Sequence, residues 1–260
     1  MGDNMSIRSI AMIQARMGSS RLPNKVLMDL CGKTDLQWVI ERVKRSEFVD
    51  EVMVITSIEK NNLPLIQLCA ELGIRVFVGS EEDVLDRFYQ ASKLMRPDRI
   101  VRITADCPMF DWRILDKALQ SIEEDTDYLW MGEDAFPDGL DLEIIKYDAL
   151  EKAWESARMS SEREHVTLYF RNHPEIFRIQ LFEFPIKGYG HCRWTLDENN
   201  DYEMINKIYK YFTDRGREDF VTEDIIEFLK ANPEIEKING MFTRNEGLVK
   251  SIREDKVIQV

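Results

Sequence analysis

Residues 9–25 read SIAMIQARMGSSRLPNK, a short apolar run followed by a loop of cations and small side chains. The run 9–13 predicts a buried strand. The loop then holds Arg16, Arg21 and Lys25 together with one glycine and two serines. Backbone N–H groups and hydroxyls of such a loop can approach phosphate oxygens closely, while arginine and lysine supply positive charge. The stretch predicts a phosphate-binding loop, with a solvated loop of scattered charges as the alternative.

The loop matches neither of the two common nucleotide-binding motifs. The order from Gly18 to Lys25 suggests a Walker A motif, but Asn24 replaces the glycine before the lysine and Val26 replaces serine or threonine. The dinucleotide fingerprint G-x-G-x-x-G is missing as well. Any phosphate site here must therefore be of another kind.

Composition sets the broad class. The chain has 260 residues, 44% hydrophobic and 32% charged, with a formal net charge of −13. This balance fits a globular protein and argues against a general nucleic-acid binder, which needs a broad basic surface. No apolar run approaches the roughly 18 residues of a membrane span, and residues 1–8 lack a signal-peptide core. We expect a cytoplasmic protein whose four cysteines are free thiols, because neither cysteines nor histidines show metal-site spacing.

Strands and helices are predicted to alternate in the first half. The expected strands are 9–13, 51–56, 74–78 and 99–104, and the expected helices are 36–43, 63–72, one capped by Ser80, and 112–122. This order implies right-handed crossovers and a largely parallel sheet, with ligands beyond the carboxyl ends of the strands.

The second half is less regular. We expect strands at 128–131, 140–145, 176–184 and 193–196, and helices at 148–157, 162–170, 201–212 and 222–230. Residues 239–260 show no clear pattern. Because no linker or repeat appears, residues 1–260 are interpreted as one domain.

Two aspartates follow expected strands. Asp106 lies just past 99–104, and Asp197 directly follows the short run 193–196. Carboxylates at these positions can hold Mg²⁺, which would bridge phosphate oxygens. The alternative for both is a helix cap, although Asp201 is better placed to cap the helix that follows.

Two further polar segments are candidates for substrate contact. Residues 137–143 read PDGLDLE, and Asp138-Gly139 within them also favours a plain β-turn. Residues 161–166 read SEREHV and equally suit a solvated helix start.

Taken together, these motifs resemble a known family. The loop 14–25 is similar to the A-R-x-G-S-x-R-L-P-x-K signature of sugar cytidylyltransferases, among them the synthetases of CMP-sialic acid and CMP-Kdo, and looks most like the SpsF-type branch of spore coat polysaccharide biosynthesis. Supporting segments are 83–88, 102–108, 137–139, 163–167, 193–197 and 243–247. The chain departs from the branch at Asn24 and Ala105, which are often glycine, and at 198–201. Each charged group of the signature is retained.

The resemblance implies a single-domain, three-layer α/β/α nucleotidyltransferase fold with a mostly parallel, mixed sheet. About 1–130 would bind the nucleotide, and about 131–260 would bind the acceptor and form a homodimer. A sugar or sugar-acid hydroxyl would attack the α-phosphorus of CTP, with Mg²⁺ as cofactor and with neither nucleic acid nor membrane as a partner. The residues implied are catalytic Arg16, Arg21 and Lys25; nucleotide-binding Ala15, Arg16, Gly18, Ser19, Ser57, Ser80, Arg87 and Asp106; acceptor-binding Asp138, Arg163, Glu164, His165 and Arg193; and metal-binding Asp106 and Asp197.

Two further sets of candidate residues follow from this expectation. An acceptor carboxylate would call for a cation, for which Arg87, Arg163 and Arg193 are available. The aromatic residues Tyr169, Phe170 and Phe182 are candidates for the dimer interface.

Three other functions stay open. The first is a nucleotidyltransferase for another base or a sugar phosphate. The second is a nucleotide-sugar glycosyltransferase, which commonly holds metal with D-x-D; the D-x-D of this chain, Asp125 to Asp127, precedes an expected strand instead of following one. The third is a catalytically inactive binding protein, against which the complete set of charged motif residues speaks.

Overall fold

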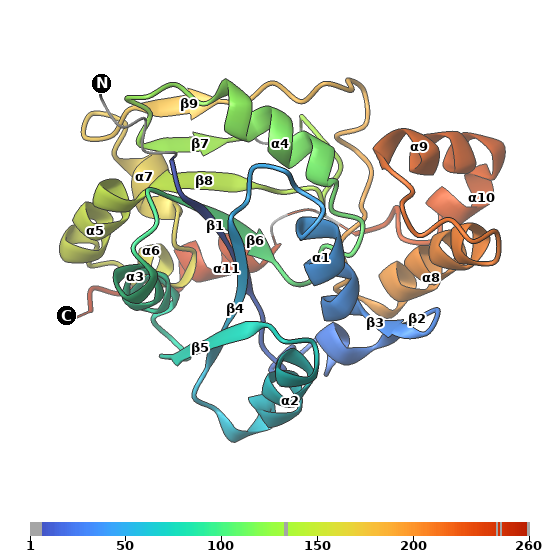
Figure 1. The fold of residues 1–260 in the computed structure, drawn as a ribbon, viewed down its shortest axis with the longest axis horizontal. Helices are drawn as coiled ribbons and strands as arrows, with labels where there is room; N and C mark the ends of the chain where they lie inside the picture. Colours follow the sequence, from blue (N-terminus) through green and yellow to red (C-terminus); the bar gives the residue numbers. More distant parts are fainter. Residues whose placement is uncertain (1–6, 133–134, 243, 245, 259–260) are drawn as a thin grey trace, which may run out of the picture.

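A seven-stranded sheet forms the centre of the computed structural model, which describes residues 7–132, 135–242, 244 and 246–258 (Figure 1). Its strands run in the order β5-β4-β1-β6-β8-β7-β9. All adjacent pairs are parallel except the two made by β8, which is antiparallel to β6 and β7. The mostly parallel, mixed sheet is therefore confirmed. The strands are β1 (Ser9–Gln14), β4 (Glu51–Ser57), β5 (Arg75–Gly79), β6 (Arg99–Thr104), β7 (Tyr128–Trp130), β8 (Glu143–Lys146) and β9 (Ile179–Leu181).

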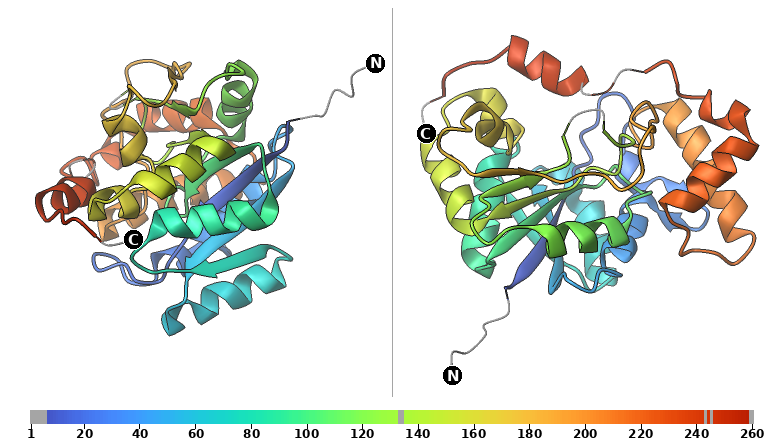
Figure 2. Two further views of the ribbon diagram at one scale, coloured as in Figure 1. Left: turned by 90° about the vertical axis from the view of Figure 1, so that its left-hand side faces the viewer. Right: turned by 90° about the horizontal axis from the view of Figure 1, so that it is seen from above.

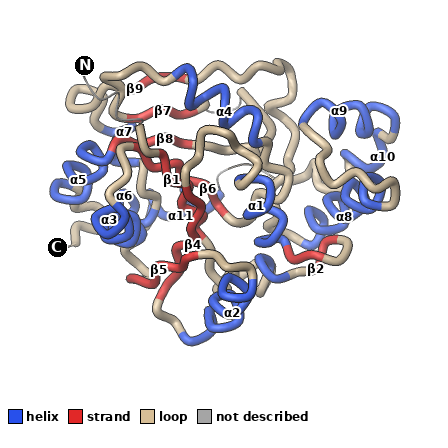
Figure 3. The backbone as a smooth tube through the Cα atoms, in the orientation of Figure 1, coloured by secondary structure: helices blue, strands red, loops and turns tan. Residues whose placement is uncertain are grey.

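Helices cover both faces of this sheet, as Figure 3 shows by colour. Val52 and Val54 of β4 pack in one core cluster with α1 (Asp35–Val43), α2 (Leu63–Glu71) and α4 (Trp112–Ser121). Met53 and Ile55 point to the opposite face and pack with α3 (Val84–Met95) and α5 (Tyr147–Ser156). This alternation follows from the period of two in a strand, and it makes the three layers that the sequence predicts.

Beyond the sheet, the helices α8 (Asn199–Thr213), α9 (Thr222–Ala231) and α10 (Pro233–Glu236) lie together at the right of Figure 1, beside the hairpin β2 (Asp29–Leu30) and β3 (Lys33–Thr34). Trp38 of α1 packs on Tyr209 of α8 with ring centroids 4.7 Å apart. The buried Arg42 donates hydrogen bonds to the backbone oxygens of Phe110 and Phe220 at 2.6 and 2.8 Å. The C-terminal helices thus extend the core of the sheet's first face.

Three local predictions were wrong. The expected helix 162–170 is two short helices, α6 (Ser160–Glu164) and α7 (Leu168–Asn172), separated at Val166, whose φ of +50° is unfavourable for a β-branched residue. In place of the strand 193–196, the structure assigns a single bridge between Asp138 and Arg193. Asp83 instead of Ser80 caps α3, by accepting a hydrogen bond from the backbone N–H of Asp86 at 2.8 Å.

The tail, which the sequence left unplaced, contains α11 (Glu246–Arg253) and returns toward α6 (Figure 2). Ser251 donates to Glu164 at 2.9 Å, and the Asp255 carboxylate accepts hydrogen bonds from the hydroxyls of Ser160 and Ser161. Of the segment 243–247, Thr243 and Asn245 lie outside the described residues. Across the described ranges, no helix combines the length and apolar character needed to cross a membrane.

Gly139 lies against the backbone of residues 194–195. Its φ is +103°, and a Cβ at this position would lie 2.6 Å from the carbonyl carbon of Trp194 and from the backbone nitrogen of Thr195. Gly139→Ala should lower the free energy of unfolding by about 2–5 kcal/mol, because left-handed strain adds to overpacking. Urea denaturation measures this loss.

Gly188→Ala is the matched control for this substitution. Gly188 has a similar φ of +93° but nothing within 4 Å of the added Cβ, so only the backbone cost of about 1–2 kcal/mol applies. Equal losses in the two variants would contradict the close approach at Gly139.

Candidate active site

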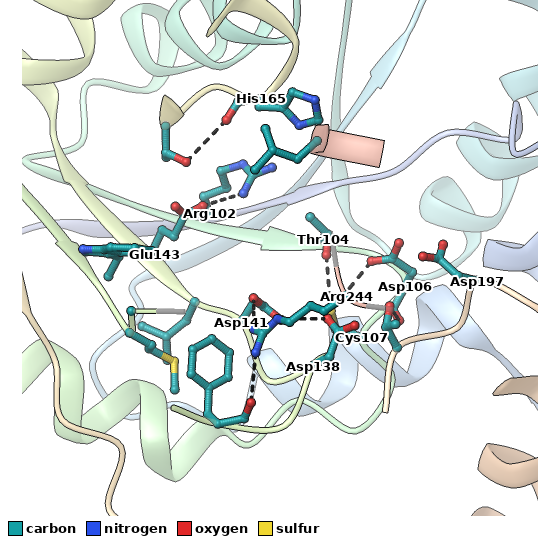
Figure 4. Close-up of a pocket in the computed structure, with 18 of the residues that line it drawn as sticks. Arg102, Thr104, Asp106, Cys107, Asp138, Asp141, Glu143, His165, Asp197 and Arg244 are labelled. Carbon is teal, nitrogen blue, oxygen red and sulfur yellow. Dashed lines mark hydrogen bonds and ion pairs between the residues drawn. The ribbon is translucent and has the colours of Figure 1, made fainter. Parts of the chain in front are cut away.

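Two cavities meet beyond the carboxyl ends of β1 and β6. The loop cavity, of about 570 Å³, is lined mainly by residues of the cationic loop that follows β1. The sheet-end cavity, of about 270 Å³, is lined by β6, β8 and the loops around them (Figure 4). The two cavities share the lining residues Arg21, Thr104, Asp106, His165 and Asp197. The cationic loop and both strand-end aspartates therefore belong to one continuous site, as the sequence predicts for their positions.

Lys25 lies at the junction. Its Nζ is 2.6 Å from Asp106 Oδ2 and 2.5 Å from Asp197 Oδ1, and its side chain is 11% exposed. Burial alone would lower the pKa of Lys25, but the charges of the two aspartates outweigh it and raise that pKa. Burial alone would raise the pKa of Asp106, but Lys25 brings it down to about 2. Lys25 and Asp106 are therefore both charged near neutral pH.

The other two cations of the loop are also paired with acids. Arg21 Nη2 is 2.7 Å from Asp197 Oδ2, and Arg16 Nη1 is 2.9 Å from Glu81 Oε1, just beyond β5. Both arginine side chains are close to half exposed. Ala15, Gly18 and Ser19 also line the loop cavity.

Ser57 acts on this loop indirectly. It is fully buried, and its hydroxyl accepts a hydrogen bond from Asn62 Nδ2 at 2.7 Å. Asn62 Oδ1 in turn accepts from the backbone N–H of Met17 at 2.8 Å. Ser80 stabilises the turn before α3 by accepting from the Asp83 N–H at 3.0 Å. Both serines lie outside the described lining of the two cavities, so the structure gives them a supporting position.

Arg163 and Arg87 are likewise placed away from the described cavity walls. Arg163 is buried and binds Asp83 through Nη2 at 2.5 Å and the Trp154 carbonyl through Nη1 at 2.6 Å. Arg87 is 1% exposed and donates to the Glu81 backbone oxygen at 3.2 Å. The Arg163 guanidinium joins α3 to α6, and the assignment of this residue to the acceptor stays a prediction. Sequence alone gives no signal that separates a buried arginine from a ligand-binding one.

The remaining predicted residues lie on the cavity walls. Glu164 lines the loop cavity, His165 lines both cavities, and Asp138 and Arg193 line the sheet-end cavity. Arg193 Nη1 is 3.2 Å from Asp138 Oδ2, while its Nε and Nη2 each donate to Asp201 at 2.9 Å. Burial and the neighbouring Asp141 raise the pKa of Asp138 to about 7, although two arginines act against the rise.

Several wall residues escaped the sequence analysis. Arg102 and Glu143 form an ion pair of 2.5 Å because they are register partners in β6 and β8. Arg244, in the tail, donates to Asp141 at 2.9 Å and to the Phe136 carbonyl at 3.0 Å. The pairing partner of β8 cannot be predicted from one sequence. The motif around Arg244 is visible in the sequence of the tail, but it does not indicate what this residue contacts.

The three aromatic residues considered for a dimer interface are core residues. Phe170 is fully buried, and Tyr169 and Phe182 are 7% and 9% exposed. Phe170 packs on Tyr128 and Phe177 within the second core cluster. Their choice as interface residues was therefore wrong.

Asp138 should make stability depend on pH. The folded chain keeps a proton on this carboxyl up to about pH 7, whereas its ordinary pKa is 3.8. Between these values the folded state binds more protons than the unfolded state, so stability falls as pH rises through this window. Asp138→Asn should flatten that fall. Urea denaturation of both proteins at several pH values from 4 to 8 measures it, and parallel pH profiles would contradict the raised pKa.

A layered sheet with a cationic loop after β1 and two aspartates around one lysine defines a nucleotide-handling α/β enzyme. Residues 10–226 match the cytidylyltransferase family. The chain therefore belongs to this family and is a CTP-dependent nucleotidyltransferase.

Individual relatives agree with the family assignment. The chain is 40% identical over 240 residues to an uncharacterised protein of Methanocaldococcus jannaschii, covering 90% of this chain and 95% of that one. It is 35% identical to the spore coat polysaccharide biosynthesis protein SpsF of Bacillus subtilis, covering 85% and 94%. A solved cytidylyltransferase of Leptospira borgpetersenii shares the fold with a TM-score of 0.84 and 32% identity, covering 91% of this chain and 100% of that one. The resemblance to the SpsF-type branch is confirmed.

Proposed function

We propose that the protein transfers CMP from CTP to a hydroxyl of a sugar or sugar-acid acceptor and releases pyrophosphate. The observation that carries this proposal is the meeting of two cavities at Asp106 and Asp197, both of which contact Lys25 of the loop cavity. One cavity is rich in cations and small residues, and the other has walls of mixed charge. Such a pair suits a triphosphate on one side and a polyhydroxylated acceptor on the other.

In the loop cavity, Arg16, Arg21 and Lys25 would bind the triphosphate. Their present partners are carboxylates, so phosphate oxygens would take over positions already suited to anions. The acceptor hydroxyl would lose its proton to solvent, and its oxygen would form a bond to the α-phosphorus while the bond from that phosphorus to the pyrophosphate oxygen breaks. Positive charge at Arg21 and Lys25 would stabilise the charge that develops on the leaving pyrophosphate.

Asp106 and Asp197 fit a magnesium site. Their oxygens converge on one ammonium group, at 2.6 and 2.5 Å from Lys25 Nζ, so the donor set is made of hard oxygens around one cationic position. Magnesium bound there would neutralise phosphate charge and help to orient the reacting groups. The two carboxylates would hold it, with Lys25 moving to the phosphates.

The sheet-end cavity would bind the acceptor. Asp138 can accept hydrogen bonds from sugar hydroxyls, and Arg102, Arg193 and Arg244 could pair with an acceptor carboxylate. The name of the Bacillus relative supports a role in the synthesis of a surface polysaccharide. We also propose a homodimer, which sedimentation of the purified protein tests.

A panel of the four nucleoside triphosphates tests this function. With Mg²⁺ and a mixture of sugar and sugar-acid acceptors, CTP should be the one triphosphate of the four that releases pyrophosphate. This release should require the acceptor. Preference for another triphosphate would overturn the choice of base. Transfer from a nucleotide-sugar without pyrophosphate release would point to a glycosyltransferase, and CTP binding without turnover would point to a binding protein.

A further inference from the structure

Three potential metal ligands gather away from the candidate active site. They are His191 and Cys192, which precede Arg193, and Glu236, the last residue of α10. Cys192 Sγ lies 3.7 Å from His191 Nε2 and 3.1 Å from Glu236 Oε1, and the two latter atoms are 3.6 Å apart. Because the ligands come from segments 44 residues apart, a search for short metal-binding spacings does not detect them.

The three atoms form a triangle of about the size of one face of the tetrahedron that four ligand atoms form around a zinc ion. Zinc bonds of 2.3 Å to sulfur and about 2.0–2.2 Å to nitrogen and oxygen imply ligand–ligand edges of about 3.4–3.6 Å. Two of the measured edges, 3.7 and 3.6 Å, lie close to these lengths, and the third, between Cys192 and Glu236, is shorter at 3.1 Å. A thiol-to-carboxylate hydrogen bond explains the shortest edge only. An ion pair between His191 and Glu236 would explain a second edge, whereas one metal ion accounts for all three together.

We propose that His191, Cys192 and Glu236 bind a zinc ion, with water as the fourth ligand. A donor set of sulfur, nitrogen and oxygen suits Zn²⁺, whereas Mg²⁺ selects oxygen ligands. This chemistry separates the site from the oxygen-only pair Asp106 and Asp197. The proposal is independent of the proposed function.

The surroundings allow both entry and a fixed geometry. The His191 side chain is 68% exposed, so a metal can approach from solvent, while Cys192 is 3% exposed. The Cys192 backbone is held at both ends, since its N–H donates to the Tyr189 oxygen at 3.0 Å and its carbonyl accepts from the Asp138 N–H at 2.9 Å. One ligand is therefore already positioned before a metal arrives.

Bound zinc would join α10 to the segment that carries Arg193. A hydrogen bond of 2.8 Å from Asn239 Nδ2 to the Arg193 carbonyl already links the chain after α10 to this segment. A metal would add a second and stronger connection a few residues away. The site is thus a structural one, and it stabilises the wall of the sheet-end cavity from outside.

Cobalt titration of the full-length, metal-stripped protein tests this site. One Co²⁺ per chain should bind and produce a thiolate-to-cobalt charge-transfer band, which Zn²⁺ then abolishes, and Zn²⁺ should raise the melting temperature. Cys192→Ser should remove the band. His191→Ala and Glu236→Gln should each weaken binding by more than the 10- to 100-fold typical of losing an outer-shell partner.

Two controls separate this site from other metal binding. Cys31→Ser removes a half-buried thiol elsewhere in the chain, and Asp197→Asn alters the candidate active site; both variants should keep the band. If Cys192→Ser does not fold, the exposed His191 still provides a test, because its substitution leaves the core intact. Absence of the band in the folded wild type, its persistence in Cys192→Ser, or unchanged affinity in His191→Ala would overturn the proposal.

Discussion

Asp106→Asn is expected to lower kcat for CTP turnover by at least about 10³-fold. The Asp106 carboxylate contacts Lys25 Nζ at 2.6 Å, and its pKa of about 2 keeps it charged at any working pH. Asparagine keeps the shape but removes the charge, so Lys25, or a cation in its place, would keep Asp197 as its one remaining carboxylate partner of the pair. Pyrophosphate release under saturating CTP and Mg²⁺ measures the effect.

Asp116→Asn is the control for this substitution. Asp116 accepts hydrogen bonds from Ser46 and the Glu47 N–H on the surface of α4, outside the described walls of both cavities, so its loss should leave kcat unchanged. Full activity of a well-folded Asp106→Asn protein would remove Asp106 from the catalytic site.

Lys25→Met is expected to lower kcat by about 10²–10³-fold and to destabilise the protein as well. Methionine keeps an apolar stem of similar length but leaves Asp106 without its lysine partner, while Asp197 keeps Arg21. Lys25 lowers the pKa of Asp106 from its ordinary value of 3.8 to about 2, so this pair stabilises the fold above pH 4 and stops doing so as pH falls to 2. Urea denaturation should therefore show a clear loss at pH 7 that shrinks toward pH 3.

Lys33→Met is the control for this substitution, because it removes a lysine that is paired with acids elsewhere in the chain. Lys33 is 22% exposed and binds Glu41 and Glu218, each at 2.7 Å, in the β3 region. Its substitution should leave kcat at the wild-type level and cost less stability. If both lysine variants lose equal activity, a specific role for Lys25 is refuted.

Much of the first half was predictable, because apolar runs and helical spacing there agree with the tertiary structure. The end of β1, the loop after it and Asp106 could be assigned to one sheet edge, since parallel strands bring their carboxyl ends together. The second half failed where tertiary contacts overrule local preference. Val166 adopts a left-handed conformation that no propensity favours, and it divides the helix predicted there.

Side-chain roles were predictable only where position along a strand determines them. Arg163 and Arg193 look equivalent in the sequence. In the structure, Arg163 forms an ion pair with Asp83, whereas Arg193 lines the sheet-end cavity. Glu143 lines the cavity because β8 runs against β6, a pairing that depends on the whole sheet. These assignments need the three-dimensional register, which local spacing does not contain.

The pairing of Arg16, Arg21 and Lys25 with Glu81, Asp197 and Asp106 has one more consequence. In a chain of net charge −13, these cations carry their own counter-ions before any ligand arrives. Under the proposed function, nucleotide binding would be an exchange of anions: phosphate oxygens would replace carboxylates, and the released carboxylates would become available to a metal. The resting and the loaded states would then balance their charge with the same three cations.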